Sequence, residues 1–351
     1  MNITPFTILF SISFFSLLFI IYFKKFKKNK FPETNALFTE ALNSMVRGEK
    51  NKTISLLKQV VKNDSDHVQA YLQLGNIIRE DNPEQSVKIH QSLTVRPNLE
   101  VDLIVDIHKA LAIDYETMGH YAKAKIEAEN VLSLEKRNLW ALSYLIKNAE
   151  NEKEWDKAAT LSKRLKKITG KDNNESLAEF EVYKGLEKLK DGHVDGAKIL
   201  FLRAIKLSPN FSKSYMYLGD IYSKTRDLVK AIENWELYAL KDFKNGYQIF
   251  SKIESALFDL GRYSEVENFY KRILDNDKNN FQAIIRLANV LEEKGERVEA
   301  ISLLDKFLIE KKSDIRTDLM KLKLQIPTST PIELTQKLDA ILENLLSKNN
   351  D

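Results

Sequence analysis

The stretch "KSYMYLGDIYSKTRDLVKAIENWELYAL", residues 213–240, decides the fold. It consists mostly of large side chains, yet Gly219 and Ala231 stand twelve positions apart within it. Apolar residues recur around both at spacings of three and four, which indicates two helices with a turn near Arg226. Two antiparallel helices that approach closely need small residues at the contact and large residues around it. The stretch therefore predicts a helical hairpin.

The same spacing recurs along the chain. Small residues at positions 8 and 20 of a unit, with large residues at positions 4, 7, 11, 24 and 27, appear in units that begin at residues 34, 68, 105, 139, 178, 212, 247 and 281. The first two units and the seventh fit more loosely, and residues 97–104 and 170–177 are expected to be loops or lengthened helices. This periodicity resembles the tetratricopeptide pattern of paired helices. It predicts an all-α tetratricopeptide repeat superhelix, an α-solenoid of about eight repeats over residues 34–314.

Residues 315–351 depart from this register. A solenoid needs an atypical end unit to cover its last apolar face, so we expect these residues to form a C-terminal helical cap. The alternative is a helix that docks onto a partner protein.

The N-terminal segment indicates a membrane anchor. Residues 1–23 carry no charged side chain, and residues 3–23 would span about 31 Å as a helix, close to the ~30 Å of a bilayer core. Five lysines follow within a basic juxtamembrane segment, residues 24–33: Lys24, Lys25, Lys27, Lys28 and Lys30. The positive-inside rule then places the C-terminal part in the cytoplasm. We expect one transmembrane helix in an inner (cytoplasmic) membrane.

Composition argues against several classes of function. The formal charge is +4, but without those five lysines 49 basic residues face 50 acidic ones, so no basic surface for nucleic acid is expected. There is no cysteine, and the five histidines lack metal-binding spacing. Neither a glycine-rich phosphate loop nor a nucleophile motif is present. We therefore expect no enzyme, no cofactor and no metal.

A surface for protein partners is what the pattern favours instead. In a superhelix of this kind, positions 2, 5, 9 and 12 of each first helix line the concave face. A mixture of amide, apolar and charged side chains there suits an extended peptide or a partner helix. The residues predicted to contact a partner are Gln69, Leu72, Asn76, Lys213, Met216, Asp220, Ser223, Gln282, Ile285, Asn289 and Glu292.

The second unit carries a more specific likeness. It reads "AYLQLGNIIRE" at residues 70–80 and "VKIHQSL" at residues 87–93. Together with the N-terminal anchor, these segments resemble the lipopolysaccharide assembly protein B family, whose patterns are A-x-L-x-L-G-N and I-x-I-H-Q-x-L. The matching residues are Gly75, Asn76, Ile89, His90, Gln91 and Leu93.

The resemblance implies a function. Members of that family are bacterial inner-membrane proteins with cytoplasmic repeats, and they help a membrane AAA protease to degrade the lipid A deacetylase. They also end in a rubredoxin-like module that holds a metal through two C-x-x-C pairs, and this sequence contains no cysteine to build one. The resemblance therefore implies a membrane-tethered adaptor without that metal. The alternative is a general membrane-anchored scaffold for an envelope or secretion assembly.

Overall fold

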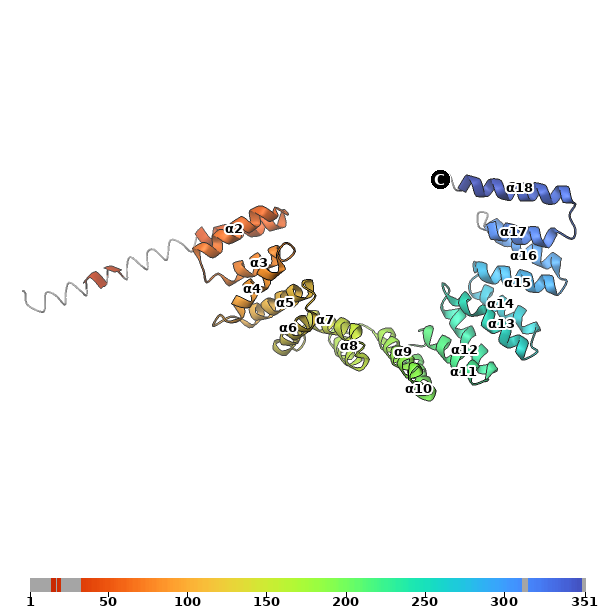
Figure 1. Cartoon of the computed structure of the whole chain (residues 1–351), viewed down its shortest axis with the longest axis horizontal. Helices are drawn as coiled ribbons and strands as arrows, with labels where there is room; N and C mark the ends of the chain where they lie inside the picture. Colours follow the sequence, from red (N-terminus) through yellow and green to blue (C-terminus); the bar gives the residue numbers. More distant parts are fainter. Residues whose placement is uncertain (1–13, 17, 20–32, 311–314, 349–351) are drawn as a thin grey trace, which may run out of the picture. The chain divides into compact units, whose positions relative to one another are not determined.

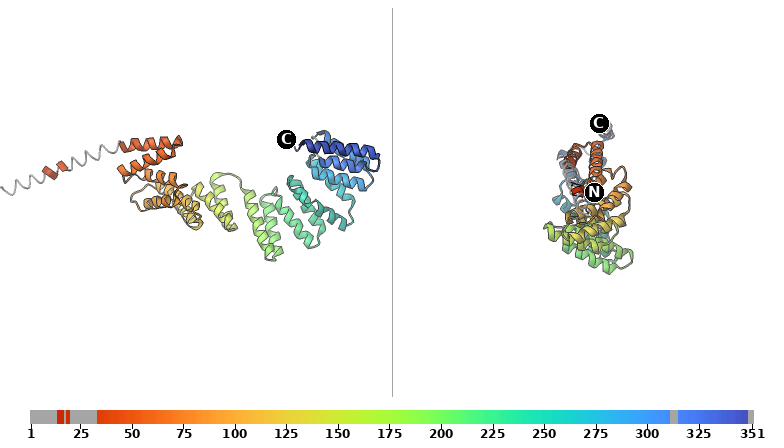
Figure 2. Two further views of the ribbon diagram at one scale, coloured as in Figure 1. Left: turned by 45° about the horizontal axis from the view of Figure 1, so that its top comes forward. Right: turned by 90° about the vertical axis from the view of Figure 1, so that its left-hand side faces the viewer.

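The computed structural model describes residues 14–16, 18–19, 33–310 and 315–348, and it contains no β-strand in these ranges. Two compact units make up the chain, residues 1–171 and residues 172–351. Within each unit, successive helices pack side by side and are joined by short turns (Figures 1 and 2). The predicted all-α class is confirmed for the described residues.

The first unit consists of helices that follow one another in pairs. Residues 33–46 form a helix that precedes α2, and the remaining helices alternate with turns of a few residues. Their bounds are α2 Lys50–Asn63, α3 Val68–Ile78, α4 Pro83–Thr94, α5 Val101–Thr117, α6 Tyr121–Leu134, α7 Leu139–Asn151 and α8 Trp155–Thr169.

The second unit continues the pairing and adds two helices. A 3₁₀ turn, η1, lies directly before α13. The bounds are α9 Asn174–Lys190, α10 Val194–Leu207, α11 Lys213–Lys224, α12 Leu228–Lys241, η1 Gly246–Ile249, α13 Phe250–Asp259, α14 Ser264–Asn276, α15 Phe281–Glu293, α16 Arg297–Glu310, α17 Ile315–Gln325 and α18 Pro331–Lys348.

One backbone feature recurs at the end of the first helix of seven pairs. The residue at position 15 of the repeat unit adopts a left-handed conformation. This conformation ends a helix because it lets the following N–H groups bond to the last carbonyl groups of the helix. Glycine occupies this position in most pairs, but Lys153 (φ 59°) and Arg226 (φ 63°) take it in two. The second pair differs, because α4 begins with Pro83 after the N-cap Asn82, whose side chain accepts a hydrogen bond from the Gln85 amide.

Small residues admit large ones at the centre of each hairpin. A Cβ placed on Gly219 would lie 2.3 Å from Trp235 Cδ1, and one on Gly185 would lie 2.4 Å from Phe201 Cε1. Ala231 is fully buried in the core cluster that contains Trp235. The glycine of the α11–α12 hairpin therefore makes room for an aromatic ring, which agrees with the spacing that predicted the hairpin.

The extra residues between units lengthen helices. Both α5 and α9 have 17 residues, whereas α11 has 12. They begin at Val101 and Asn174, four residues before the starts expected from the register. Parts of residues 97–104 and 170–177 are thus helical, which was one of the two alternatives.

The end of the second unit is only partly covered. Met320 and Leu324 of α17 are buried in the core that α15 and α16 supply. On α18, Ile341 is buried, but Leu338, Leu342 and Leu345 are exposed. A cap function for residues 315–351 stays a prediction.

The predicted membrane anchor falls mostly outside the described residues. Residues 3–13, 17 and 20–23 are among those not described, and the described residues 14–16 and 18–19 are helical and exposed. Among the described helices, none has the length and hydropathy that crossing a bilayer requires.

Candidate functional site

The family motif of the second unit lies at the contact of α3, α4 and α5. His90 projects from α4 over Gly75 of α3, and a Cβ on that glycine would lie 2.4 Å from the His90 Nε2 atom. His90 thus fills the position that Phe201 and Trp235 fill in later hairpins. Its side chain is fully buried. The His90 ring therefore fills the space above a helix glycine, as the aromatic rings of Phe201 and Trp235 do in their hairpins. Unlike the phenyl ring, it brings two polar nitrogens into the core.

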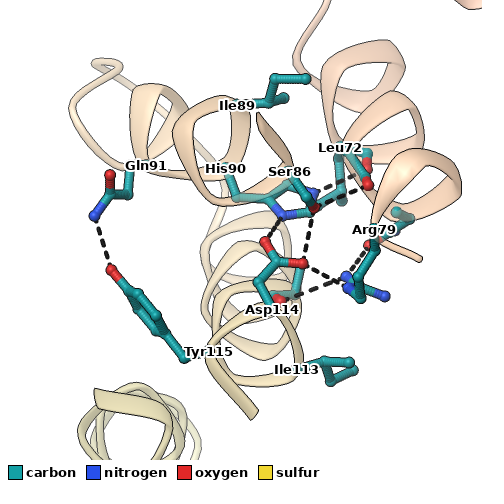
Figure 3. Close-up of polar contacts among 12 residues, drawn as sticks. Leu72, Arg79, Ser86, Ile89, His90, Gln91, Ile113, Asp114 and Tyr115 are labelled. Atoms are coloured by element: carbon teal, nitrogen blue, oxygen red, sulfur yellow. Dashed lines mark hydrogen bonds and ion pairs between the residues drawn. The ribbon is translucent and has the colours of Figure 1, made fainter. Parts of the chain in front are cut away.

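Asp114 of α5 satisfies that polarity (Figure 3). Its Oδ2 lies 2.6 Å from His90 Nδ1, and its Oδ1 accepts hydrogen bonds from Ser86 Oγ at 2.8 Å and from Arg79 Nε at 2.5 Å. His90 Nε2 lies 3.1 Å from the Leu72 carbonyl oxygen. A buried carboxylate is stable only when charges and donors surround it, and here Ser86 and His90 of α4 and Arg79, which follows the end of α3, do so.

Residue types alone could suggest a hydrolytic triad at this place. The geometry excludes that role for Ser86, His90 and Asp114. The single Ser86 hydroxyl hydrogen is shared between the Asp114 carboxylate and the Gly75 carbonyl oxygen at 2.9 Å, and the imidazole is not its partner. All three side chains are inaccessible to solvent, so no substrate can reach them. The cluster joins the second helix pair to the third.

The other motif residues join the second pair to the pairs on either side of it. Leu93 is fully buried in the core with Ile107 and Leu111, and Ile89 packs partly buried against the preceding pair. Gln91 Nε2 donates to the Tyr115 hydroxyl at 2.8 Å. Burial raises the pKa of Tyr115, so this phenol stays protonated.

Arg79 connects the buried cluster to the surface. Besides Asp114, its Nη2 donates to Asn76 Oδ1 at 2.6 Å. Both side chains line a pocket of about 520 Å³ together with Gly48, Lys50 and Thr117, among other residues of the first three helix pairs. The motif residue Asn76 is therefore held in place by the cluster while it lines a surface hollow.

The predicted contact residues on α3 have different environments. Gln69 is exposed, and Asn76 is half-buried at the pocket. Leu72 is 5% exposed and packs with Leu93 and Leu111 in the core. A side chain this buried offers no surface, so the prediction that Leu72 contacts a partner is corrected: α3 turns it towards α4 and α5.

On α11 and α15 the predicted residues share one face, but half of them are already paired within the chain. Met216 and Ile285 pack partly buried against the core, and Ser223 and Gln282 are half-buried. In the second unit, one ion pair joins each of the helices α9, α11, α13 and α15 to the first helix of the following pair. These ion pairs are Glu179–Lys213 at 3.8 Å, Asp220–Lys252 at 2.7 Å, Glu254–Arg286 at 2.9 Å and Glu292–Lys323 at 2.7 Å. We call these four pairs the ladder.

Two hydrogen bonds also involve predicted residues on this face. Asp220 also accepts from Trp235 Nε1 at 3.0 Å, and Asn289 accepts from Lys323 Nζ at 3.1 Å. The predicted residues Lys213, Asp220, Asn289 and Glu292 thus bind neighbouring repeats.

A second pocket in the first unit was not predicted from the sequence. It measures about 590 Å³ and lies between the end of α5, the start of α6 and one face of α7. Its lining residues are Glu116, Tyr121, Tyr144, Lys147, Asn148, Asn151 and Glu152, and we call it the α7 pocket. The signal in the sequence was the fourth unit, whose first helix carries two asparagines and a lysine on one side.

Aromatic and charged groups are combined in the α7 pocket. Tyr144 stacks on Trp140 with ring centroids 5.4 Å apart, and Tyr121 is 60% exposed. Burial, and then the charge of Glu116, raise the pKa of Tyr144 to about 12. The phenol therefore remains a hydrogen-bond donor at physiological pH.

Among the residues that the structure describes, no group of three or more histidine, aspartate or glutamate side chains could hold a metal ion. The histidines that make ion contacts, His90 and His108, each face a single carboxylate.

The comparisons with known proteins agree with this architecture. A family model described as tetratricopeptide repeat matches residues 200–233. Lipopolysaccharide assembly protein B of Escherichia coli is 23% identical over 273 residues, which are 76% of this chain and 70% of that protein. The Haemophilus influenzae protein of the same name is 25% identical over 311 residues, 82% of this chain and 76% of that protein.

Among solved structures, the crystal structure of MamA protein aligns with a TM-score of 0.38 and 17% identity, covering 51% of this chain and 94% of that chain. A score this low supports no statement about function. The sequence relatives are matched over most of both chains. The resemblance predicted from the second unit agrees with these findings: the chain is similar to lipopolysaccharide assembly protein B, and residues 200–233 match a tetratricopeptide repeat.

Proposed function

We propose that this chain is a membrane-tethered adaptor that binds proteins on the cytoplasmic side of the inner membrane. In this proposal it promotes proteolysis of the lipid A deacetylase by a membrane AAA protease. The observation that carries the proposal is the likeness to lipopolysaccharide assembly protein B over about three quarters of the chain. Helix pairs with polar pockets, as described in the first unit, support a role in binding proteins.

Tethering would strengthen such binding. Residues 3–23 are uncharged and precede five lysines, which is the pattern of a cytoplasm-facing anchor. An anchor confines the repeats to the membrane surface, where their effective concentration towards other membrane proteins rises. A version that begins after Lys30 should keep the repeat core but bind membrane partners more weakly.

Depletion of the protein in its native cell tests the adaptor role. The amount of the lipid A deacetylase, measured by immunoblot, should rise because its proteolysis slows. Re-expression of the full chain should restore it, whereas the version that begins after Lys30 should restore it less. An unchanged deacetylase level in a cell that makes lipid A would contradict the proposal.

A second candidate is a general membrane-anchored scaffold for an envelope or secretion assembly. It is favoured by one observation, that the motif residues Gly75, His90 and Leu93 serve packing and so reflect shared architecture. Copurification of the tagged full chain from native membranes, followed by mass spectrometry, separates the two candidates. The adaptor requires the protease or the deacetylase among the partners, and the scaffold requires another envelope complex without them.

A further inference from the structure

One residue that lines the α7 pocket has a side-chain acceptor without a donor. Asn148 lies between Tyr144 and Asn151 in the lining. Its Oδ1 atom is buried, and no hydrogen-bond partner for it exists among the described residues. A buried acceptor without a partner costs free energy, and rotation of the amide towards a bound group that donates a hydrogen bond would remove that cost.

The charges of the α7 pocket are also available. Glu116 and Lys147 line it, and neither has an ion pair within the described part of the chain. Glu152, by contrast, is paired with Lys125. An occupant can therefore place a basic group against Glu116 without breaking an existing ion pair.

We propose that the α7 pocket binds an extended segment of a partner polypeptide through its main chain. A side-chain amide presents one acceptor and two donors, which complement the N–H and C=O of a peptide group. In this arrangement the Asn148 amide rotates to accept from a main-chain N–H of the partner, and Asn151 extends the polar contact along α7. Tyr121 and Tyr144 supply aromatic surface for one side chain, and Glu116 favours a lysine or arginine beside it. The inference rests on the proposed protein-binding function and specifies where and how it operates.

The ladder of the second unit differs from the α7 pocket in how its charges are paired. Its acidic and basic side chains already bind one another, and Asn289 is bonded to Lys323. A peptide that bound to the ladder would have to replace these internal contacts, whereas Glu116 and Lys147 of the α7 pocket can pair with an occupant directly.

A phage-displayed library of random 12-residue peptides, selected against the purified full chain, tests the inference without assuming a partner. Selected peptides are labelled and their affinities are measured by fluorescence anisotropy. Asn148→Leu should weaken binding about tenfold, the factor expected when one neutral hydrogen bond is lost. Asn148→Asp retains an acceptor and should bind within about threefold of the original chain. The matched control is Asn289→Leu, which should leave affinity unchanged.

Charge supplies an independent readout if Asn148→Leu lowers the melting temperature. Glu116→Lys changes a surface side chain and should reverse the preference, so that peptides with a basic residue lose affinity and acidic peptides gain it. Selection of no peptide would overturn the inference. So would equal affinity for Asn148→Leu and the original chain together with an unaltered preference in Glu116→Lys.

Competition distinguishes this inference from the adaptor proposal. If the purified lipid A deacetylase displaces the labelled peptide, the adaptor uses the α7 pocket. If the deacetylase binds the full chain but Asn148→Leu does not weaken that binding and no peptide depends on Asn148, the adaptor proposal stands and the pocket inference fails. If the peptides depend on Asn148 but the deacetylase does not bind, the pocket stands and that partner is excluded.

Discussion

The second helix pair and the sixth place different chemistry at the same structural position. In the sixth, Gly219 makes room for the ring of Trp235, whose indole N–H reaches the half-buried Asp220. In the second, Gly75 makes room for His90, whose ring is bonded to the fully buried Asp114 of the next pair. An apolar ring gains stability from contact area, whereas an imidazole needs a partner for each nitrogen. The second pair is therefore tied to its neighbour by a buried polar contact, whereas the polar contacts of the sixth pair to its neighbours are partly exposed ion pairs.

The two units differ in a related way on their first helices. The ladder of the second unit satisfies its own charges from repeat to repeat. The α7 pocket of the first unit retains two charges, Glu116 and Lys147, that form no ion pair among the described residues. Charges that are already paired gain little from a ligand, so the α7 pocket is a better surface for recognition than the ladder.

The largest expected effect comes from breaking the polar contact. Asp114→Ala removes the acceptor of three side chains and leaves Arg79 and His90 without their carboxylate. Loss of one partner from a buried ionic cluster costs about 3–5 kcal/mol, and we expect a decrease of that size in the free energy of unfolding of the first unit. Urea denaturation followed by circular dichroism measures it.

The control is Asp106→Ala on the same helix, an exposed residue that should change stability by about 0.5 kcal/mol or less. A loss below about 1 kcal/mol for Asp114→Ala would show that the cluster adds little to the joining of the two pairs.

A smaller effect is expected from closing the glycine contacts. In Gly219→Ala the new Cβ would lie 2.3 Å from the Trp235 ring, and in Gly75→Ala it would lie 2.4 Å from the His90 ring. Overpacking costs about 1–3 kcal/mol. We expect the greater loss at Gly75, because hydrogen bonds to Asp114 prevent the His90 ring from moving aside. Thermal and urea unfolding of both variants would measure the difference.

Gly196→Ala is the matched control for the two glycine variants. It lies in α10, and the atoms nearest to its new Cβ are 3.9 Å away. This substitution should be neutral or stabilising, since alanine favours helix over glycine. Equal destabilisation of all three variants would contradict the packing explanation.

A third prediction concerns the ladder. Lys252→Ala breaks the pair with Asp220, in which the lysine side chain is 47% exposed. We expect the free energy of unfolding to decrease by about 1 kcal/mol or less. The decrease should be smaller in 1 M salt because exposed ion pairs are screened. Chemical denaturation at two salt concentrations measures it. A salt-independent loss above about 2 kcal/mol would mean that the ladder is a buried network, as in the second pair.

The smallest expected effect is a pH dependence in the second unit. Lys271 and Lys294 lower the pKa of Glu267 below its ordinary value of 4.5. A carboxyl with a lowered pKa stabilises the folded state above its unfolded pKa, and this contribution disappears as the pH falls through the folded pKa. Glu267→Gln should therefore destabilise the protein slightly at pH 7 and have no effect near pH 2. Melting temperatures at both values check this, and an equal shift at both would contradict it.

Much of the fold could be predicted because its signals are local. Gly219, Ala231 and Trp235 lie within one hairpin, and the spacing of small and large residues reports directly which sides of two adjacent helices meet. The candidate site was predicted less well. Asn76 does line a pocket, but Leu72 lies in the core, and the α7 pocket was not recognised.

Two residues of the buried cluster are unusual in the sequence. His90 occupies the position where other units carry Phe201 or Trp235, and Asp114 interrupts an apolar run on α5. However, they lie 24 residues apart on two different helices. No local pattern says that a histidine of one repeat bonds to an aspartate of the next.

By itself, then, the sequence determined the paired helices, their approximate limits and the relationship to lipopolysaccharide assembly protein B, because periodic packing within a hairpin depends on neighbours in the chain. Only the tertiary structure decided which polar groups are satisfied. The ladder, the Asp114 cluster and the unpaired Asn148 acceptor all depend on the distance between side chains of successive helices. The stacking of the helices sets that distance. Polar groups that lie close enough to bond hold the protein together, and polar groups that do not can bind a partner.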